Sequence, residues 1–149
     1  MFGKNRQYRK LADQIGKEIH RQLQQAFKEK DEMLGTASEM VFTAGYLGSF
    51  TFVAFSKIGC REIDVHLKYI RYFCNGVLPN RLWEVFERGK ALNDLSRSGD
   101  RDEFIKTRES YDLGVKAGIN DAGQFFSKDN PPSNLANFLV GNSVEGPMI

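Results

Sequence analysis

The stretch MVFTAGYLGSFTFVAFS, residues 40–56, decides the fold of this chain because it contains seventeen residues without a single charge. Thr36 and Glu39 stand before it at the spacing of a capping box, and Lys57 and Gly59 follow it. This pattern predicts a helix that is apolar on every side. In a short chain such a helix needs other helices to cover it, so we expect residues 40–56 to form the centre of a helical bundle.

Amphipathic repeats on both sides of this segment supply the cover. We expect a first helix up to Gly35, a third between Gly59 and Gly76, a fourth from Pro79 and a fifth up to Asn130. Their buried faces are predicted from apolar residues three or four positions apart: Tyr8, Leu11, Ala12, Ile15, Ile19, Leu23, Ala26, Phe27 and Leu34; Ile63, Leu67, Ile70 and Cys74; Leu82, Val85, Phe86, Leu92 and Leu95; Phe104, Ile105, Tyr111, Val115, Ile119, Ala122 and Phe126.

A short helix over residues 133–140 completes the expected elements, and no strand pattern is present. The predicted fold class is all-α, a single compact bundle of about five helices around a buried, apolar second helix. Residues 1–140 are expected to form this one domain, and residues 141–149 a loose tail.

Five of the glycines inside predicted helices bear on close packing or on a possible motif. Gly45 and Gly48 interrupt the apolar segment, where we expect them to let a neighbouring helix approach closely. Gly114, Gly118 and Gly123 lie in the fifth helix at a spacing unlike a P-loop or a dinucleotide fingerprint. We interpret them as packing glycines or as the site of a kink.

Composition indicates a soluble intracellular protein, with 41% hydrophobic and 27% charged residues. Two cysteines, Cys60 and Cys74, do not make a disulfide framework, and their spacing matches no zinc motif. The basic N-terminal residues are not followed by the apolar segment of a secretory signal, so we expect a cytoplasmic location. Residues 40–56 reach the lower limit for crossing a bilayer, but their four Thr and Ser residues and two Gly favour a buried soluble helix.

Positive charge is concentrated at the start of the chain. Eight lysines and arginines against three acidic residues give residues 1–30 a charge of +5, whereas the whole chain carries only +2. We take the basic face of the first helix as a candidate partner-binding surface; its residues are Arg6, Arg9, Lys10, Lys17 and Arg21. Such a helix can bind phosphate backbones, lie on an anionic membrane, or pack its apolar stripe on the central helix and leave the charged face free. The last arrangement is the one expected.

Aromatic residues and arginines form a second candidate surface at the end of the third helix and the start of the fourth. Its members are Tyr69, Tyr72, Arg71, Arg81 and Trp83. Such a patch suits the binding of a peptide or a nucleic-acid base. We favour the interpretation that Phe73 and Trp83 belong to the core and that the tyrosines lie at its boundary with their hydroxyls in solvent, and we keep the patch as the best candidate binding surface outside the first helix.

Catalytic and metal-binding patterns are weak. Glu62 and His66 lie one helical turn apart, with Asp64 between them. A helical di-metal site needs Glu-x-x-His on two helices, whereas this spacing is Glu-x-x-x-His and occurs once. We expect a solvated face of ion pairs here, Glu62 with His66 and Asp64 with Lys68. Neither cysteine has an identifiable histidine and carboxylate set, and no Gly-x-Ser-x-Gly elbow occurs. The prediction is no catalytic residue, no metal and no cofactor.

Three short segments resemble a known family: Ser56-Lys57-Ile58-Gly59, Asp64-Val65-His66 and Val85-Phe86-Glu87-Arg88-Gly89-Lys90. Over about residues 40–110 they are similar to the TerB-like helical domain of tellurite-resistance proteins and of DjlA-type J-domain co-chaperones. The Ala-Asp-Gly turn common in that family is replaced by Lys57-Ile58-Gly59, and no His-Pro-Asp tripeptide occurs. The resemblance implies a helical interaction module without the chemistry of a J domain.

The sequence therefore predicts a non-enzymatic interaction or adaptor domain of TerB-like character that binds a protein partner. The alternative is a basic-helix binder of nucleic acid or of an anionic membrane surface, which would add a peripheral membrane location to the cytoplasmic one.

Overall fold

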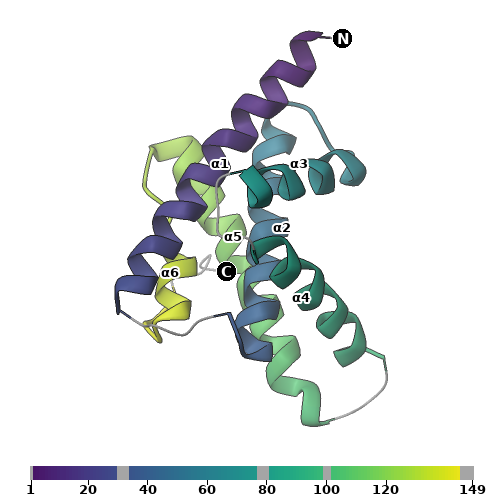
Figure 1. Ribbon diagram of the computed structural model, residues 1–149, viewed down its shortest axis with the longest axis vertical. Helices are drawn as coiled ribbons and strands as arrows, with labels where there is room; N and C mark the ends of the chain where they lie inside the picture. Colours follow the sequence, from purple (N-terminus) through teal and green to yellow (C-terminus); the bar gives the residue numbers. More distant parts are fainter. Residues whose placement is uncertain (1, 30–33, 77–80, 99–101, 145–149) are drawn as a thin grey trace.

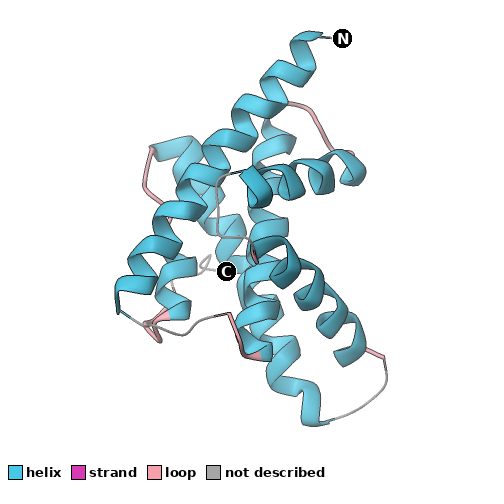
Figure 2. Ribbon diagram, viewed as in Figure 1, coloured by secondary structure: helices cyan, strands magenta, loops and turns pink. Residues whose placement is uncertain are grey.

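The computed structural model describes residues 2–29, 34–76, 81–98 and 102–144. These ranges contain six α-helices and a short 3-10 helix, with no strand among them (Figures 1 and 2). The elements are α1 (Phe2–Glu29), α2 (Ala37–Lys57), α3 (Ile63–Gly76), α4 (Leu82–Ser96), η1 (Asp102–Phe104), α5 (Ile105–Lys128) and α6 (Asn134–Leu139). The all-α prediction is confirmed. Pro79, and with it the expected start of the fourth helix, lies outside the described residues, as do residues 145–149 of the expected tail.

Helix α2 is the centre of the bundle, as predicted, and it contacts all five other α-helices. The capping box is present at its start: Thr36 Oγ1 accepts from the Glu39 amide at 3.1 Å, and Glu39 Oε1 accepts from the Thr36 amide at 3.2 Å. Large side chains fill its core faces, with Phe42 and Phe50 completely buried. The helix is not covered all round, however, because Phe52 is 44% exposed. Among the described residues, no helix has both the length and the apolar character needed to cross a membrane.

Helix α5 crosses α2 through small residues. A Cβ atom on Gly114 would lie 2.2 Å from the carbonyl oxygen of Phe42, so only glycine allows this approach of the two backbones. Gly45 and Gly118 have the same role, as predicted, but Gly48 and Gly123 do not, since a Cβ on either would meet nothing within 4 Å.

The close crossing explains why several predicted core positions are wrong. Because α5 uses its glycine and alanine face against α2, its larger residues Ile105 and Ile119 point outward and are 42% and 44% exposed. The apolar spacing misleads in α4 and α3 too, where Leu95 is 53% and Ile63 57% exposed. Periodicity identifies an apolar face, but in a helix with two such faces it does not say which one is covered.

Helix α1 lies along one side of the bundle, and its N-terminal turns extend beyond the other elements (Figure 1). Its stripe of Leu11, Ile15, Ile19 and Leu23 is buried, as predicted. It packs mainly against α3 and α6, however, and much less against α2 than expected. Phe27 at the end of the stripe is 39% exposed. The packing of α1 on α3 forms the cleft described below.

A buried polar network joins four helices, and the sequence pattern did not reveal it. The Tyr46 hydroxyl donates to Asp121 Oδ2 at 2.7 Å and accepts from Gln22 Nε2 at 3.0 Å. Asp121 also accepts from the backbone amide and the side-chain amide of Asn134, while Gln22 Oε1 accepts from the Leu135 amide. Burial raises the pKa values of both Asp121 and Tyr46. The network fixes α6 against α1, α2 and α5.

Candidate functional site: a basic cleft between α1 and α3

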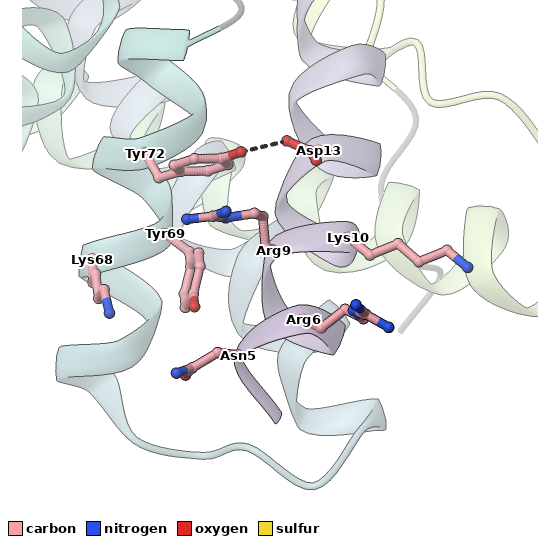
Figure 3. A pocket seen from close by; sticks show the side chains of 8 residues that line it. All are labelled: Asn5, Arg6, Arg9, Lys10, Asp13, Lys68, Tyr69 and Tyr72. Carbon is pink, nitrogen blue, oxygen red and sulfur yellow. Dashed lines mark hydrogen bonds between the residues drawn. The ribbon is translucent and has the colours of Figure 1, made fainter. Parts of the chain in front are cut away.

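A cleft of about 550 Å³ lies between α1 and α3. It forms because both helices bury one apolar face in the bundle and leave polar faces opposite each other at their exposed edge. The residues that line it are Asn5, Arg6, Arg9, Lys10 and Asp13 from α1, and Lys68, Tyr69 and Tyr72 from α3 (Figure 3). We call this set the basic cleft.

Two tyrosines form the α3 side of the basic cleft. Tyr69 is only 6% exposed, and its ring stacks on Phe55 of α2 with 5.6 Å between the centroids. Tyr72 packs edge-on against Tyr69, and its hydroxyl donates a 2.9 Å hydrogen bond to Asp13 Oδ1 on α1 (Figure 3). This hydrogen bond and partial burial raise the pKa of Tyr72 above its usual value of 10.0. The rings are therefore held in place from both helices.

Cations cover the tyrosine faces. The Arg9 guanidinium lies over the Tyr72 ring at 5.7 Å, and the Lys68 ammonium lies over the Tyr69 ring at 5.4 Å. Figure 3 shows Arg9 extending from α1 toward α3, whereas Arg6 and Lys10 point away from α3. Within the described part of the chain, no carboxylate forms an ion pair with any of these four cations. With Asp13 as its single acidic residue, the lining has an excess charge of +3.

The two candidate surfaces from the sequence meet only in part. Arg6, Arg9 and Lys10 from the basic helix, and Tyr69 and Tyr72 from the aromatic patch, line the same cleft.

The other predicted members lie elsewhere. Arg21 hydrogen-bonds Glu18 at 3.2 Å and the Pro132 carbonyl, and Lys17 is exposed but does not line the cleft. Arg71 lies over the half-buried ring of Trp83 at 5.5 Å, away from the lining. Arg81 is exposed and also lies outside it.

Three residues of the cleft were not among the predicted site residues: Asn5, Asp13 and Lys68. Lys68 was expected to form an ion pair with Asp64, but no such pair joins these two described residues. Asp13 could have been predicted from the sequence, because it lies one turn after Arg9 on the same basic face of the helix.

The predicted solvated face at Glu62 and His66 is wrong. His66 is only 3% exposed, and its Nε2 lies 2.9 Å from the carbonyl oxygen of Cys60. The imidazole packs against the rings of Phe52 and Phe55, with centroids 5.6 and 5.5 Å away. The turn after α2 brings the Cys60 carbonyl to the ring, so an internal hydrogen bond replaces the expected ion pair.

Potential metal ligands are dispersed in the described ranges, which hold no group of three or more His, Cys, Asp or Glu side chains suited to a metal ion. Cys60 and Cys74 are both buried and free, and burial raises the pKa of the Cys74 thiol to about 12. A smaller apolar hollow of about 210 Å³ lies between α2, α3, α4 and α5, beside Phe52 and His66. Neither the two cysteines nor this apolar hollow contributes a residue to the lining of the basic cleft.

Comparisons with known proteins identify no relative: no family model matches the chain, and no curated protein or solved structure is significantly similar to it.

Proposed function

We propose that this chain is a non-enzymatic interaction or adaptor domain that binds a protein partner through the basic cleft between α1 and α3. One observation carries the proposal: the lining of one concave surface holds four cations from two helices, and no carboxylate of the described residues forms an ion pair with any of them. Exposed cations that have no internal ion-pair partner are available to an external carboxylate, and a charged cleft raises the rate of encounter with an oppositely charged molecule.

The internal contacts of the cleft support the same function. Tyr69 is anchored on Phe55 in the core, and the hydrogen bond from Tyr72 to Asp13 joins the two helices across the cleft. A binding surface that is already ordered loses less conformational entropy on association than a flexible one. Arginine is also among the residues that most often dominate the energetics of protein interfaces.

A TerB-like interaction module would have the same class of function, and we keep the resemblance of residues 40–110 as part of the proposal. We also propose a cytoplasmic location, because Cys60 and Cys74 are free thiols, the usual state of cysteines in a reducing compartment.

Affinity capture of the tagged full-length chain from lysate of its native cells, with and without nuclease, tests the proposal. A double variant, Arg9→Gln with Lys68→Gln, removes both cations that lie on the tyrosines. The matched control, Lys106→Gln with Lys116→Gln, removes two exposed cations of α5, and neither control residue lines the cleft.

We expect one near-stoichiometric protein that survives nuclease, is lost from the cleft variant and is retained by the control. A bound fraction that disappears with nuclease would contradict the proposal and favour nucleic-acid binding through α1. Equal capture by both variants would exclude the basic cleft as the binding surface.

A further inference from the structure

The basic cleft also indicates what kind of segment it binds, an inference that rests on the proposed function. We propose that its ligand is an acidic peptide segment, whose carboxylates are bound by Arg9 and Lys68 while Arg6 and Lys10 add attraction from the outer edge. Three features of the cleft favour this ligand: the cations that cover the tyrosine rings, the hydrogen bond that occupies Asp13, and the shape of the cleft.

The tyrosine faces are already occupied. Arg9 covers Tyr72, while Tyr69 has Lys68 over its ring and Phe55 stacked on it. Proteins that bind single-stranded nucleic acid need open aromatic faces on which bases stack. A base would have to displace a cation here, so this cleft recognises its ligand through the cations and not through the rings.

The hydrogen bond of Tyr72 keeps Arg9 available. Asp13 lies one helical turn after Arg9, the usual spacing for an ion pair within a helix. Its Oδ1 instead accepts from the Tyr72 hydroxyl at 2.9 Å, and no ion pair forms between Asp13 and Arg9. The guanidinium therefore keeps its donors for a carboxylate, which it can bind through two parallel hydrogen bonds.

Asp13 also gives the basic cleft a polarity. It is the single carboxylate of the lining, and it stands at the C-terminal end of the α1 contribution, with Asn5 at the other end. A ligand carboxylate is repelled at the Asp13 end and attracted toward Arg9 and Lys68. Removing the charge of Asp13 should therefore strengthen the binding of an acidic segment.

The shape of the cleft favours a peptide over a duplex. It offers a volume of about 550 Å³ between the two helices, which is enough for several side chains. Duplex DNA is usually met by an element that protrudes into a groove, not by a hollow. A peptide that carries carboxylates on neighbouring residues can reach both Arg9 on α1 and Lys68 on α3.

The test measures binding of fluorescent oligoglutamate to the full-length chain by anisotropy, with oligoglutamine and oligodeoxythymidylate of matched length as the other probes. We expect oligoglutamate to bind more tightly than both, with an affinity that decreases as salt is added. Arg9→Gln with Lys68→Gln should weaken it about tenfold or more, whereas Lys106→Gln with Lys116→Gln should change it less than about twofold.

The variant Asp13→Asn should increase the affinity for oligoglutamate, a result that a misfolded protein would not give. It should tighten oligoglutamate binding by about threefold, and the exposed control Asp94→Asn on α4 should leave it unchanged. Tighter binding of oligodeoxythymidylate through Arg9 and Lys68 would overturn both this inference and the proposed function. If oligoglutamate does not bind while a protein is still captured through the cleft, the inference is overturned and the proposed function stands.

Discussion

The hydroxyl of Tyr72 donates a hydrogen bond of 2.9 Å to Oδ1 of Asp13 and so joins α3 to α1 across the basic cleft. The two residues are 59 positions apart in the chain. The bond orders the tyrosine ring and also occupies the carboxylate nearest to Arg9 along α1. Structure and charge in the cleft therefore depend on the same contact.

Titration of Tyr72 tests this contact. The hydrogen bond to Asp13 is the largest cause of its raised pKa, followed by burial, since ionisation would remove the donated proton and place two negative charges together. We expect Asp13→Asn to move the pKa of Tyr72 back toward 10.0, as measured by NMR of tyrosine Cζ carbons. The control Asp64→Asn should leave the pKa unchanged, and an unchanged value in Asp13→Asn would show that the hydrogen bond does not form in solution.

The crossing of α5 over α2 depends on the absence of a side chain at Gly114. Gly114→Ala would bring a Cβ within 2.2 Å of a backbone carbonyl oxygen of α2, so the helices must separate. We expect a loss of about 3 kcal/mol in the free energy of unfolding, measured with urea. The control Gly123→Ala, in the same helix but with no atom within 4 Å of the new Cβ, should increase stability by about 0.5 to 1 kcal/mol. Similar effects at both positions would contradict this account of the crossing.

The buried carboxyl of Asp121 should give stability a specific dependence on pH. Because burial raises its pKa in the native state, the unfolded chain releases this proton first, near pH 3.8. The quantity to follow is the free energy of unfolding of the wild-type protein minus that of Asp121→Asn. This difference should decrease as pH rises from 3.8 toward the native pKa of Asp121 and become constant above it. Urea unfolding of both proteins over this range measures the difference. A difference that increases with pH would mean that the hydrogen bonds of the carboxylate outweigh its burial.

The Cys74 thiol should be unreactive in the native protein. Its pKa of about 12 leaves about one molecule in 10⁴ as thiolate at pH 8, and the side chain is buried. Peptide mapping after alkylation should show Cys74 modified only as fast as the protein unfolds, with the urea-unfolded chain as the control. The same shift makes the native state less stable as pH rises from 9.0 toward 12, because the unfolded thiol ionises first. Rapid native alkylation of Cys74 would contradict its burial.

The class of fold was predictable because one feature decided it. An uncharged stretch of seventeen residues with a capping box before it has few other structures available, and α2 begins and ends within a few residues of the predicted limits. The covered faces were harder to predict. In α5 the small residues Gly114 and Gly118 face the core and Ile119 does not, which reverses the rule that the largest apolar residues are buried.

The candidate site was predictable only in part, since it joins two surfaces that are far apart in the sequence. Charge asymmetry indicated Arg6, Arg9 and Lys10, and aromatic clustering indicated Tyr69 and Tyr72, but nothing local showed that α1 packs on α3. Burial of the imidazole of His66 was missed for a related reason. Its partner is a backbone carbonyl in the preceding turn, and side-chain spacing carries no information about it.

The central claim is that the basic cleft is the binding surface, and photo-crosslinking in the native cells tests it most directly. A photoreactive phenylalanine analogue at Asn5 on α1 reports what touches the cleft, and the same analogue at Lys106 on α5 is the control, because both positions are exposed and only the first lines the cleft. The account predicts one discrete protein adduct from position 5, resistant to nuclease, lost when Arg9 and Lys68 are both changed to Gln, and absent from position 106. No adduct from position 5, or the same adduct from both positions, would contradict it.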